Sequence, residues 1–220
     1  MSFDWQGLPS YLSPLLRGAT VTIALSTVSI GAATIVGLVV AAGRVGRVRV
    51  VNVLASAYLA AVRNTPELVQ FYLIFYALPA AGVVIDPFWA AVIVLGLHYG
   101  AYLSEAFRGG ILSIERGQWE AGQVLGMPRR VAWQRVVLPQ VFRRVVPTWG
   151  NYFLIMFKAT SLAGVITVQE LFFSANVIAS RNFRYFELWT LAALIYLVIS
   201  LAGSVLVRRL ERRLARSERG

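Results

Sequence analysis

Long apolar runs without any charged residue dominate this chain. Arg17 and Arg44 enclose 26 uncharged residues, and Glu187 and Arg208 enclose 20. A helix needs roughly 20 consecutive apolar residues to cross the hydrocarbon core of a membrane, which is about 30 Å thick. Both runs are therefore predicted to be transmembrane helices.

Three further spans are predicted between these two runs. Two uncharged stretches of 18 residues meet at Asp86. A last apolar stretch begins near Pro147, and the charges of Lys158 and Glu170 interrupt it. The pattern predicts an all-α membrane protein with about five transmembrane helices, folded as a single domain over residues 1–220.

The composition agrees with a membrane protein. The chain is 58% hydrophobic and 14% charged, whereas a soluble domain is about 25% charged. Residues 1–17 contain Trp5 and Tyr11, and aromatic rings favour the headgroup level of a membrane. These residues are expected to form an interfacial lead-in or a frayed tail. The chain has no cysteine, which excludes disulfides and thiolate metal sites.

The basic residues are concentrated in alternate loops. A net charge of +11 could indicate nucleic-acid binding, but this alternation indicates membrane sorting by the positive-inside rule. It predicts a bacterial inner-membrane protein with its N-terminus and Asp86 outside and its C-terminus in the cytoplasm. Arg181 and Arg184 are exceptions on the outer side. The predicted cytoplasmic segments contain Arg44, Arg47 and Arg49; Arg108, Arg116, Arg129, Arg130, Arg135, Arg143 and Arg144; and Arg208, Arg209, Arg212, Arg213, Arg216 and Arg219.

The cytoplasmic loop over residues 108–147 carries the densest charge. Its apolar residues recur at helical spacing, and Gly126 and Pro128 interrupt them. This pattern predicts two short helices joined by a sharp turn. A basic, amphipathic loop of this kind indicates either a partner subunit or a helix pair that lies on anionic lipid.

A motif with two fixed gaps lies within this loop. It consists of Glu120, Ala121 and Gly122, then Gly126 after three residues, and after nine more Val136, Val137, Leu138 and Pro139. It resembles the EAA signature of permease subunits in ATP-binding-cassette (ABC) importers, from which Gly122 and Val136 depart. The resemblance implies the type I permease fold, with a cytoplasmic coupling helix between the third and fourth spans that docks on an ATPase subunit. A glycine turn should end this helix, and a proline should start the return helix.

The resemblance covers most of the chain and is closest to the polar-amino-acid uptake branch, which includes histidine-, glutamine- and arginine-type permeases. The matching segments are Arg63–Gln70, Ala101–Gly110, Gly117–Ala121, Lys158–Leu162 and Glu170-Leu171, where Ala159 replaces the acid of the branch's Lys-Asp-Thr-Ser-Leu. Two local features favour other solutes. The sequence around Glu67 is similar to the corresponding segment of permeases for basic amino acids and opines. The sequence around His98-Tyr99 is similar to that of permeases for ectoine-type compatible solutes.

The resemblance also implies the partners and the division of labour. A permease of this family pairs with a second permease subunit, identical or different, with two ATP-binding subunits and with an extracytoplasmic solute-binding protein, in contact with membrane lipid. ATP and Mg²⁺ are then bound by the partner subunits, and this chain has no cofactor, no metal and no nucleic-acid partner. The sequence has no Gly-x-x-x-x-Gly-Lys-Ser/Thr loop and one histidine, so we expect a transport subunit and not an enzyme.

Polar residues inside the predicted spans are candidates for the substrate cavity. A charge at membrane depth costs about 2.5–3.5 kcal/mol on insertion scales, so such residues usually face the interior of the protein. The expected cavity residues are Arg63, Thr65, Gln70, His98, Lys158, Thr160, Ser161 and Glu170. A zwitterion needs a cation for its carboxylate and an anion for its ammonium, which Glu67 or Glu170 could supply.

Simpler interpretations stay open for the same residues. Arg63 and Glu67 are four positions apart and could neutralise each other on one helix face. Glu105 and Arg108 are predicted to form a structural ion pair. Pro66 is expected to break its span, either to line a cavity or only to aid packing. For the whole chain, the rival function is a passive channel or a lipid-interacting membrane protein.

Overall fold

The computed structural model describes residues 8–46 and 48–216. Helices form nearly all of this part of the chain. The α-helices are α1 (Leu8–Val45), α2 (Arg49–Arg63), α3 (Glu67–Tyr72), α4 (Pro87–Leu112), α5 (Arg116–Val124), α6 (Arg129–Ala132), α7 (Leu138–Ala159), α8 (Leu171–Asn182) and α9 (Tyr185–Arg216). Two π-helical turns, Leu73–Ala77 and Trp133–Val137, and two 3₁₀ turns, Leu78–Ala81 and Thr160–Ile166, complete the helical elements.

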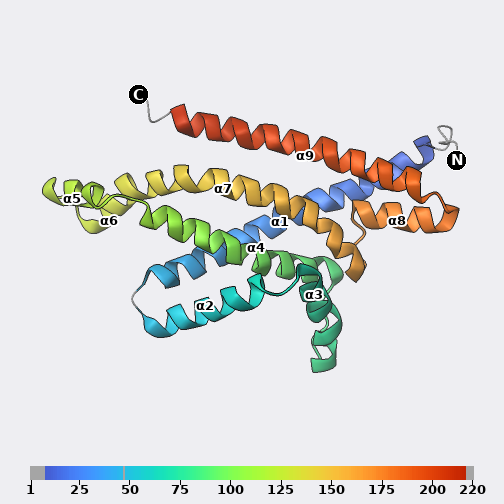
Figure 1. Cartoon of the computed structure of the whole chain (residues 1–220), viewed down its shortest axis with the longest axis horizontal. Coiled ribbons are helices and arrows are strands. Elements are labelled where there is room, and N and C mark those ends of the chain that lie inside the picture. Colours follow the sequence, from blue (N-terminus) through green and yellow to red (C-terminus); the bar gives the residue numbers. More distant parts are fainter. Residues whose placement is uncertain (1–7, 47, 217–220) are drawn as a thin grey trace.

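The long helices α1, α4, α7 and α9 run along the long axis of the molecule (Figure 1). Helices α5 and α6 lie at one end, together with the C-terminal end of α9, whereas α8 and the start of α1 lie at the other end. Helix α3 projects away from this group. The Arg-rich ends of α1, α4 and α9 therefore lie toward the same end of the molecule, as the charge pattern predicts.

The structure has fewer membrane-length helices than the five expected. Three described helices are long and apolar enough to cross a membrane, Pro9–Val45, Pro87–Leu112 and Tyr185–Leu214. A fourth span results if Arg129–Ile166 and Leu171–Asn182, which meet at a bend of 47°, count as one. The remaining expected span is the shorter helical segment Glu67–Ala81, in which α, π and 3₁₀ turns follow one another.

The chain breaks between α2 and α3, as Pro66 predicts. Asn64 ends α2 with its side-chain amide donating to the Ala60 carbonyl at 2.7 Å. Pro66 has φ −56° and ψ 135°, and helical geometry resumes at Glu67. The cause is steric, because the proline ring disfavours helical geometry in the residue before it.

Both π-helical turns have the same local cause. Pro79 and Pro139 each follow such a turn by two residues. A proline inside a helix cannot donate its backbone hydrogen bond, and its ring clashes with the carbonyl four residues earlier. That carbonyl belongs to Phe75 in the first turn and to Arg135 in the second, the central residue of each. The wider turn relieves the clash and inserts one extra residue into the helix.

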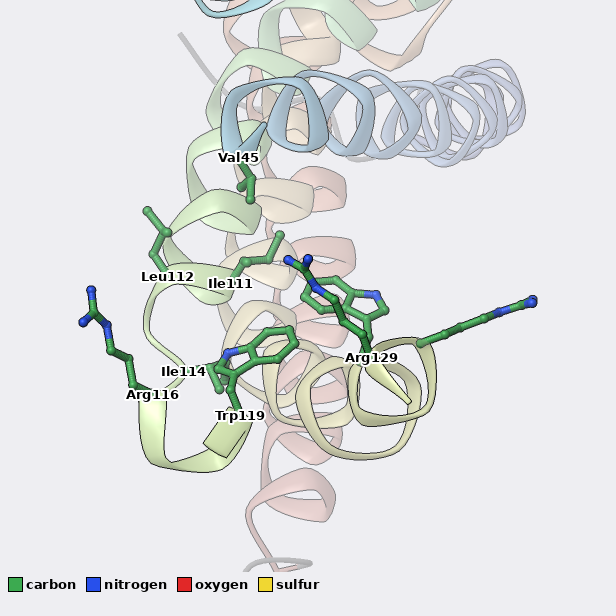
Figure 2. A pocket seen from close by; sticks show the side chains of 9 residues that line it. Val45, Ile111, Leu112, Ile114, Arg116, Trp119 and Arg129 are labelled. Atoms are coloured by element: carbon green, nitrogen blue, oxygen red, sulfur yellow. The ribbon is translucent and has the colours of Figure 1, made fainter. Parts of the chain in front are cut away.

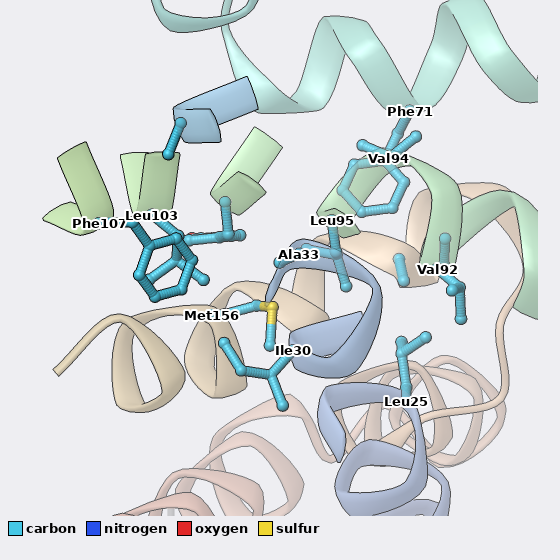
Figure 3. Close-up of a cluster of buried hydrophobic side chains, with 14 of the residues drawn as sticks. Leu25, Ile30, Ala33, Phe71, Val92, Val94, Leu95, Leu103, Phe107 and Met156 are labelled. Carbon is cyan, nitrogen blue, oxygen red and sulfur yellow. The ribbon is translucent and has the colours of Figure 1, made fainter. Parts of the chain in front are cut away.

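Helices α1 and α4 form the centre of the fold, and small residues let their backbones approach closely. A Cβ atom on Gly100 would lie 2.7 Å from Val36 Cγ1, and one on Gly37 would lie 3.0 Å from Leu103 Cβ. In membranes such small-residue contacts replace the hydrophobic effect as the source of helix association. Figure 3 shows the core around this contact, where Leu25, Ile30 and Ala33 of α1 meet side chains from α3, α4 and α7.

Candidate coupling loop and solute cavity

The predicted coupling helix is α5, and a glycine turn ends it as expected. Gly126 has φ +68°, a left-handed conformation that only glycine adopts without strain. Its N–H donates to Gln123 O at 2.9 Å, and the Met127 N–H donates to Gly122 O at 2.9 Å. This pair of bonds is a Schellman motif, which satisfies the last carbonyl groups of the helix.

The return helix begins earlier than the motif suggested. Helical geometry resumes at Arg129, directly after Pro128, and continues through α6 and a π-helical turn into α7. Pro139, the proline of the motif, lies at the start of α7, just after the π turn. The expected pair of short helices is therefore one short helix, α5, packed against the first turns of a long one.

Side chains that flank the motif fix α5 against the return helix. The rings of Trp119 and Trp133 stack with their centroids 5.6 Å apart. The Gln140 amide donates to Gln118 Oε1 at 3.2 Å. Gly122 is buried, and a Cβ atom there would lie 3.3 Å from Ala132 Cβ. The departure from Ala at this motif position thus accompanies a tight helix contact.

The tip of the loop presents an exposed apolar surface. Val124 is 87% exposed and Leu125 is 73% exposed, although both are large aliphatic side chains. Glu120 and Ala121 are exposed on the same short helix. An acid beside exposed aliphatic groups at a rigid turn is typical of a surface that another protein covers.

A second polar group lies between α2 and α4. The Arg63 guanidinium lies over the Tyr102 ring, 5.1 Å from its centroid. Both residues line a cavity of about 350 Å³ that also contains Asn64 and the carboxylate of Glu105. Glu105 accepts a hydrogen bond from Arg108 Nε at 3.1 Å and another from Arg44 of α1. The predicted Glu105–Arg108 ion pair is confirmed, and it extends to Arg44.

Gln70 and His98 meet beside this cavity. The Gln70 amide donates to the carbonyl groups of Val62 at 2.8 Å and Thr65 at 3.0 Å, across the break between α2 and α3. Its oxygen lies 3.2 Å from His98 Nδ1. Gln70 thus ties the broken segment to α4. Thr65 lines a smaller adjoining cavity of about 220 Å³ with Gln70.

Three tyrosines at this site were not among the expected cavity residues. The Tyr99 hydroxyl lies 3.5 Å from Glu67 Oε2, and the other Glu67 oxygen is buried without a partner among the described residues. The Tyr102 ring lies 5.4 Å from His98 and 5.7 Å from Tyr152 of α7. The spacing of four between His98 and Tyr102 places them on one helix face, which was the available signal.

The internal pair of Arg63 and Glu67, which the sequence left open as an alternative, does not form. Neither of the two ion pairs among residues 8–46 and 48–216 joins them. Instead Arg63 contacts Tyr102 and Glu67 contacts Tyr99, two tyrosines whose ring centroids are 6.5 Å apart on α4. A cation and a carboxylate therefore point to adjacent rings of one helix face without neutralising each other directly.

The other predicted cavity residues lie around the break after α7. The Thr160 and Ser161 hydroxyls donate to backbone carbonyls of their own turn at 2.7 and 2.9 Å. Lys158 is exposed. The structure thus brings Arg63, Gln70 and His98 together with the tyrosines of α4. It places Lys158 separately, in the last turn of α7, and Thr160 and Ser161 in the 3₁₀ segment that follows.

Glu170 belongs to a third environment. Its side chain is fully buried and caps α8, accepting hydrogen bonds from the Phe172 and Phe173 N–H groups at 2.8 and 2.5 Å. The Tyr196 hydroxyl of α9 also donates to it at 2.7 Å. Next to it, the Leu171 N–H donates to Thr22 Oγ1 of α1 at 3.1 Å. The carboxylate thus joins α8 and α9 and lies where α1 meets them.

Comparison with known proteins agrees with this geometry. Residues 33–216 match the family described as the binding-protein-dependent transport system inner membrane component. The chain belongs to this family. It is 38% identical to the glutamine transport system permease protein GlnP of Escherichia coli, over 97% of this chain and 99% of the relative. It is 41% identical to the L-cystine transport system permease protein TcyB of Bacillus subtilis, over 98% and 94%.

Solved structures of such permeases share the fold. A chain of an amino acid ABC transporter crystallised with histidines superposes with a TM-score of 0.90 at 33% identity, covering 97% of this chain and all of that one. A chain of the inward-facing MetNI methionine ABC transporter gives a TM-score of 0.73 at 18% identity, over 92% and 97%, and this shows the fold alone. As a member of the permease family, the chain is an inner-membrane transport component and not a catalyst.

The capping role of Glu170 in this permease gives a testable expectation. Glu170→Ala should lower the free energy of unfolding by about 1–3 kcal/mol, because buried N–H and hydroxyl groups lose their acceptor. Lys158→Ala, at an exposed position, is the matched control and should leave stability unchanged. Thermal unfolding of the purified chain in detergent measures both. A Glu170→Ala protein as stable as the control but defective in transport would instead make Glu170 a substrate ligand.

Proposed function

We propose that this permease imports a polar amino acid or a related small zwitterion by alternating access. The observation that carries the proposal is that one face of α4 holds a cation and a carboxylate side by side, through Tyr102–Arg63 and Tyr99–Glu67. A zwitterion presents the complementary pair of charges, and its binding in a water-poor cavity strengthens both contacts. The amino acid permeases among the relatives support the same class of solute.

The proposed cavity combines the expected residues with the missed ones. Arg63 holds the substrate carboxylate and Glu67 its ammonium, while Gln70 and His98 shape the wall between them. Tyr102 orients the Arg63 guanidinium through its ring. The remaining candidates line the translocation path next to the two helix breaks. They are Thr65 at the break between α2 and α3, and Lys158, Thr160 and Ser161 at the break after α7. Glu170 is assigned to the framework of the fold.

The proposed assembly contains a second permease subunit, two ATP-binding subunits and an extracytoplasmic binding protein. ATP and Mg²⁺ are bound by the ATP-binding subunits. Helix α5 docks on one of them through Val124, Leu125 and Glu120, and closure of the ATPase dimer moves the rigid α5–α6 unit. The ligand must bind the two states differently for this movement to drive transport.

The first test concerns coupling at the glycine turn. Gly126→Ala should reduce solute-stimulated ATP hydrolysis, because a left-handed residue with a Cβ costs roughly 1–2 kcal/mol. Gly109→Ala is the matched control, since a Cβ there meets open space at an ordinary helical φ. ATPase activity of the reconstituted complex with and without solute measures the effect. Equal stimulation in both variants would contradict the assignment of the coupling helix.

The second test concerns the substrate carboxylate. Arg63→Ala should weaken solute-stimulated ATPase activity ten- to hundredfold, the equivalent of one charge-assisted hydrogen bond, at unchanged yield of the complex. Tyr102→Phe retains the ring under Arg63 and should retain most of the activity. If Arg63→Ala instead breaks up the complex, and Glu67→Ala restores it in the double mutant, the two residues form a structural pair and Arg63 binds no substrate.

The third test concerns orientation in the inner membrane, which we propose to be N-terminus outside and C-terminus cytoplasmic. The clustering of Arg-rich helix ends at one end of the molecule supports it. Topology reporters fused after Arg49, after Arg116 and at Gly220 should read as cytoplasmic, and one at Asp86 should read as external. A cytoplasmic reading at Asp86 would reverse the orientation.

A further inference from the structure

A further cavity among the described residues lies beneath the coupling loop and not at the substrate site. It has a volume of about 800 Å³ and lies between the ends of α1 and α4 and the helices α5 and α6 (Figure 2). Its lining residues are Val45, Ile111, Leu112, Ile114, Arg116, Trp119, Arg129, Arg130 and Trp133. Cavities of this size hold small molecules of several hundred Å³.

One wall of this cavity is apolar and continues toward the membrane. Val45 is the last residue of α1 and is 41% exposed, and Leu112 is the last residue of α4 and is 61% exposed. Both helices are long enough to span a bilayer. The wall therefore lies where two spans leave the hydrocarbon, and its aliphatic side chains face either lipid chains or water.

The opposite side of the cavity carries positive charge and aromatic rings. In Figure 2 Arg129 extends toward Ile111 in the space above Trp119, and Arg116 stands apart at the edge of the cavity. Neither of the two ion pairs among the described residues includes Arg116, Arg129 or Arg130, since both are made to Glu105. No acidic side chain lines the cavity. Three arginines thus line a cavity that no acidic side chain lines.

We propose that this cavity binds an anionic phospholipid of the adjacent leaflet. The phosphate lies at Arg129, with Arg130 and Arg116 lining the same cavity, the glycerol region lies on the stacked tryptophans, and an acyl chain covers Val45 and Leu112. Basic cavities at the ends of membrane helices attract anionic headgroups, and tryptophan rings favour this depth. A soluble phosphate would leave the aliphatic wall exposed, whereas a phospholipid covers both walls at once.

Such a lipid joins the transmembrane helices to the coupling unit. It contacts α1 and α4 through its acyl chain and α5 and α6 through its phosphate, so it occupies the joint between the two parts. The site is independent of which solute the permease carries, because it shares none of the residues proposed for the substrate cavity.

The experiment uses the full chain in phosphatidylcholine vesicles titrated with phosphatidylglycerol brominated in its acyl chains. Bromine quenches nearby tryptophan fluorescence, and the Trp119→Phe/Trp133→Phe variant gives the background from the other tryptophans. We expect quenching to saturate at a low fraction of phosphatidylglycerol. Arg129→Gln/Arg130→Gln should raise the half-saturating fraction roughly 25-fold, at about fivefold per arginine.

Two further variants separate the site from general surface charge. Arg135→Gln/Arg209→Gln removes the same charge outside the cavity and should leave the half-saturating fraction nearly unchanged. Arg129→Lys/Arg130→Lys keeps the charge and should retain selective quenching, which excludes misfolding as the cause. Equal quenching by brominated phosphatidylcholine, or an equal shift in the control pair, would overturn the proposal. Loss of quenching once the ATP-binding subunits are bound would also overturn it, by assigning the arginines to the protein interface.

Discussion

The close contact between α1 and α4 is the constraint on which the remaining structure depends. A Cβ atom on Gly100 would lie 2.7 Å from Val36 Cγ1, so Val36 would have to shift, and one on Gly37 would lie only 3.0 Å from Leu103 Cβ. The contact fixes the face of α4 that carries His98, Tyr99 and Tyr102 toward α2 and α3. Lipid offers no hydrophobic drive for helix association. This close packing therefore holds the side chains on that face of α4 in place.

Local signals in the sequence predicted the features that depend on one stretch of backbone. Pro66 predicted the break between α2 and α3, and Gly126 predicted the turn after α5. Each acts locally, Pro66 by restricting the residue before it and Gly126 by adopting a positive φ. The Glu105–Arg108 pair, three positions apart on a helix, is equally local. Of the five spans expected, three are helices of membrane length and a fourth is a bent pair, while the stretch Glu67–Ala81 is a shorter helical segment. Its mixed α, π and 3₁₀ turns are not distinguished from a regular helix by hydropathy alone.

Features that depend on packing between distant segments could not be predicted in the same way. Glu170 is polar and lies in an apolar stretch, which made it a candidate ligand, but its partners come from α9 and from its own helix start. Tyr99 and Tyr102 were read only as part of a motif, although they separate Arg63 from Glu67. In both cases the deciding contacts join residues that are 26 to 39 positions apart along the chain.

The π-helical turn before Pro139 has a consequence for how this loop can vary. One extra residue in a helix rotates everything beyond it by about 100°, so the faces of α6 and α7 are offset by that angle. Substitutions within Trp133–Val137 preserve this offset, but the deletion of one residue would turn the tip with Val124 and Leu125 to a different side of the molecule. The length of this segment is therefore restrained more tightly than its amino-acid composition. Related chains should differ here by substitutions and not by insertions or deletions.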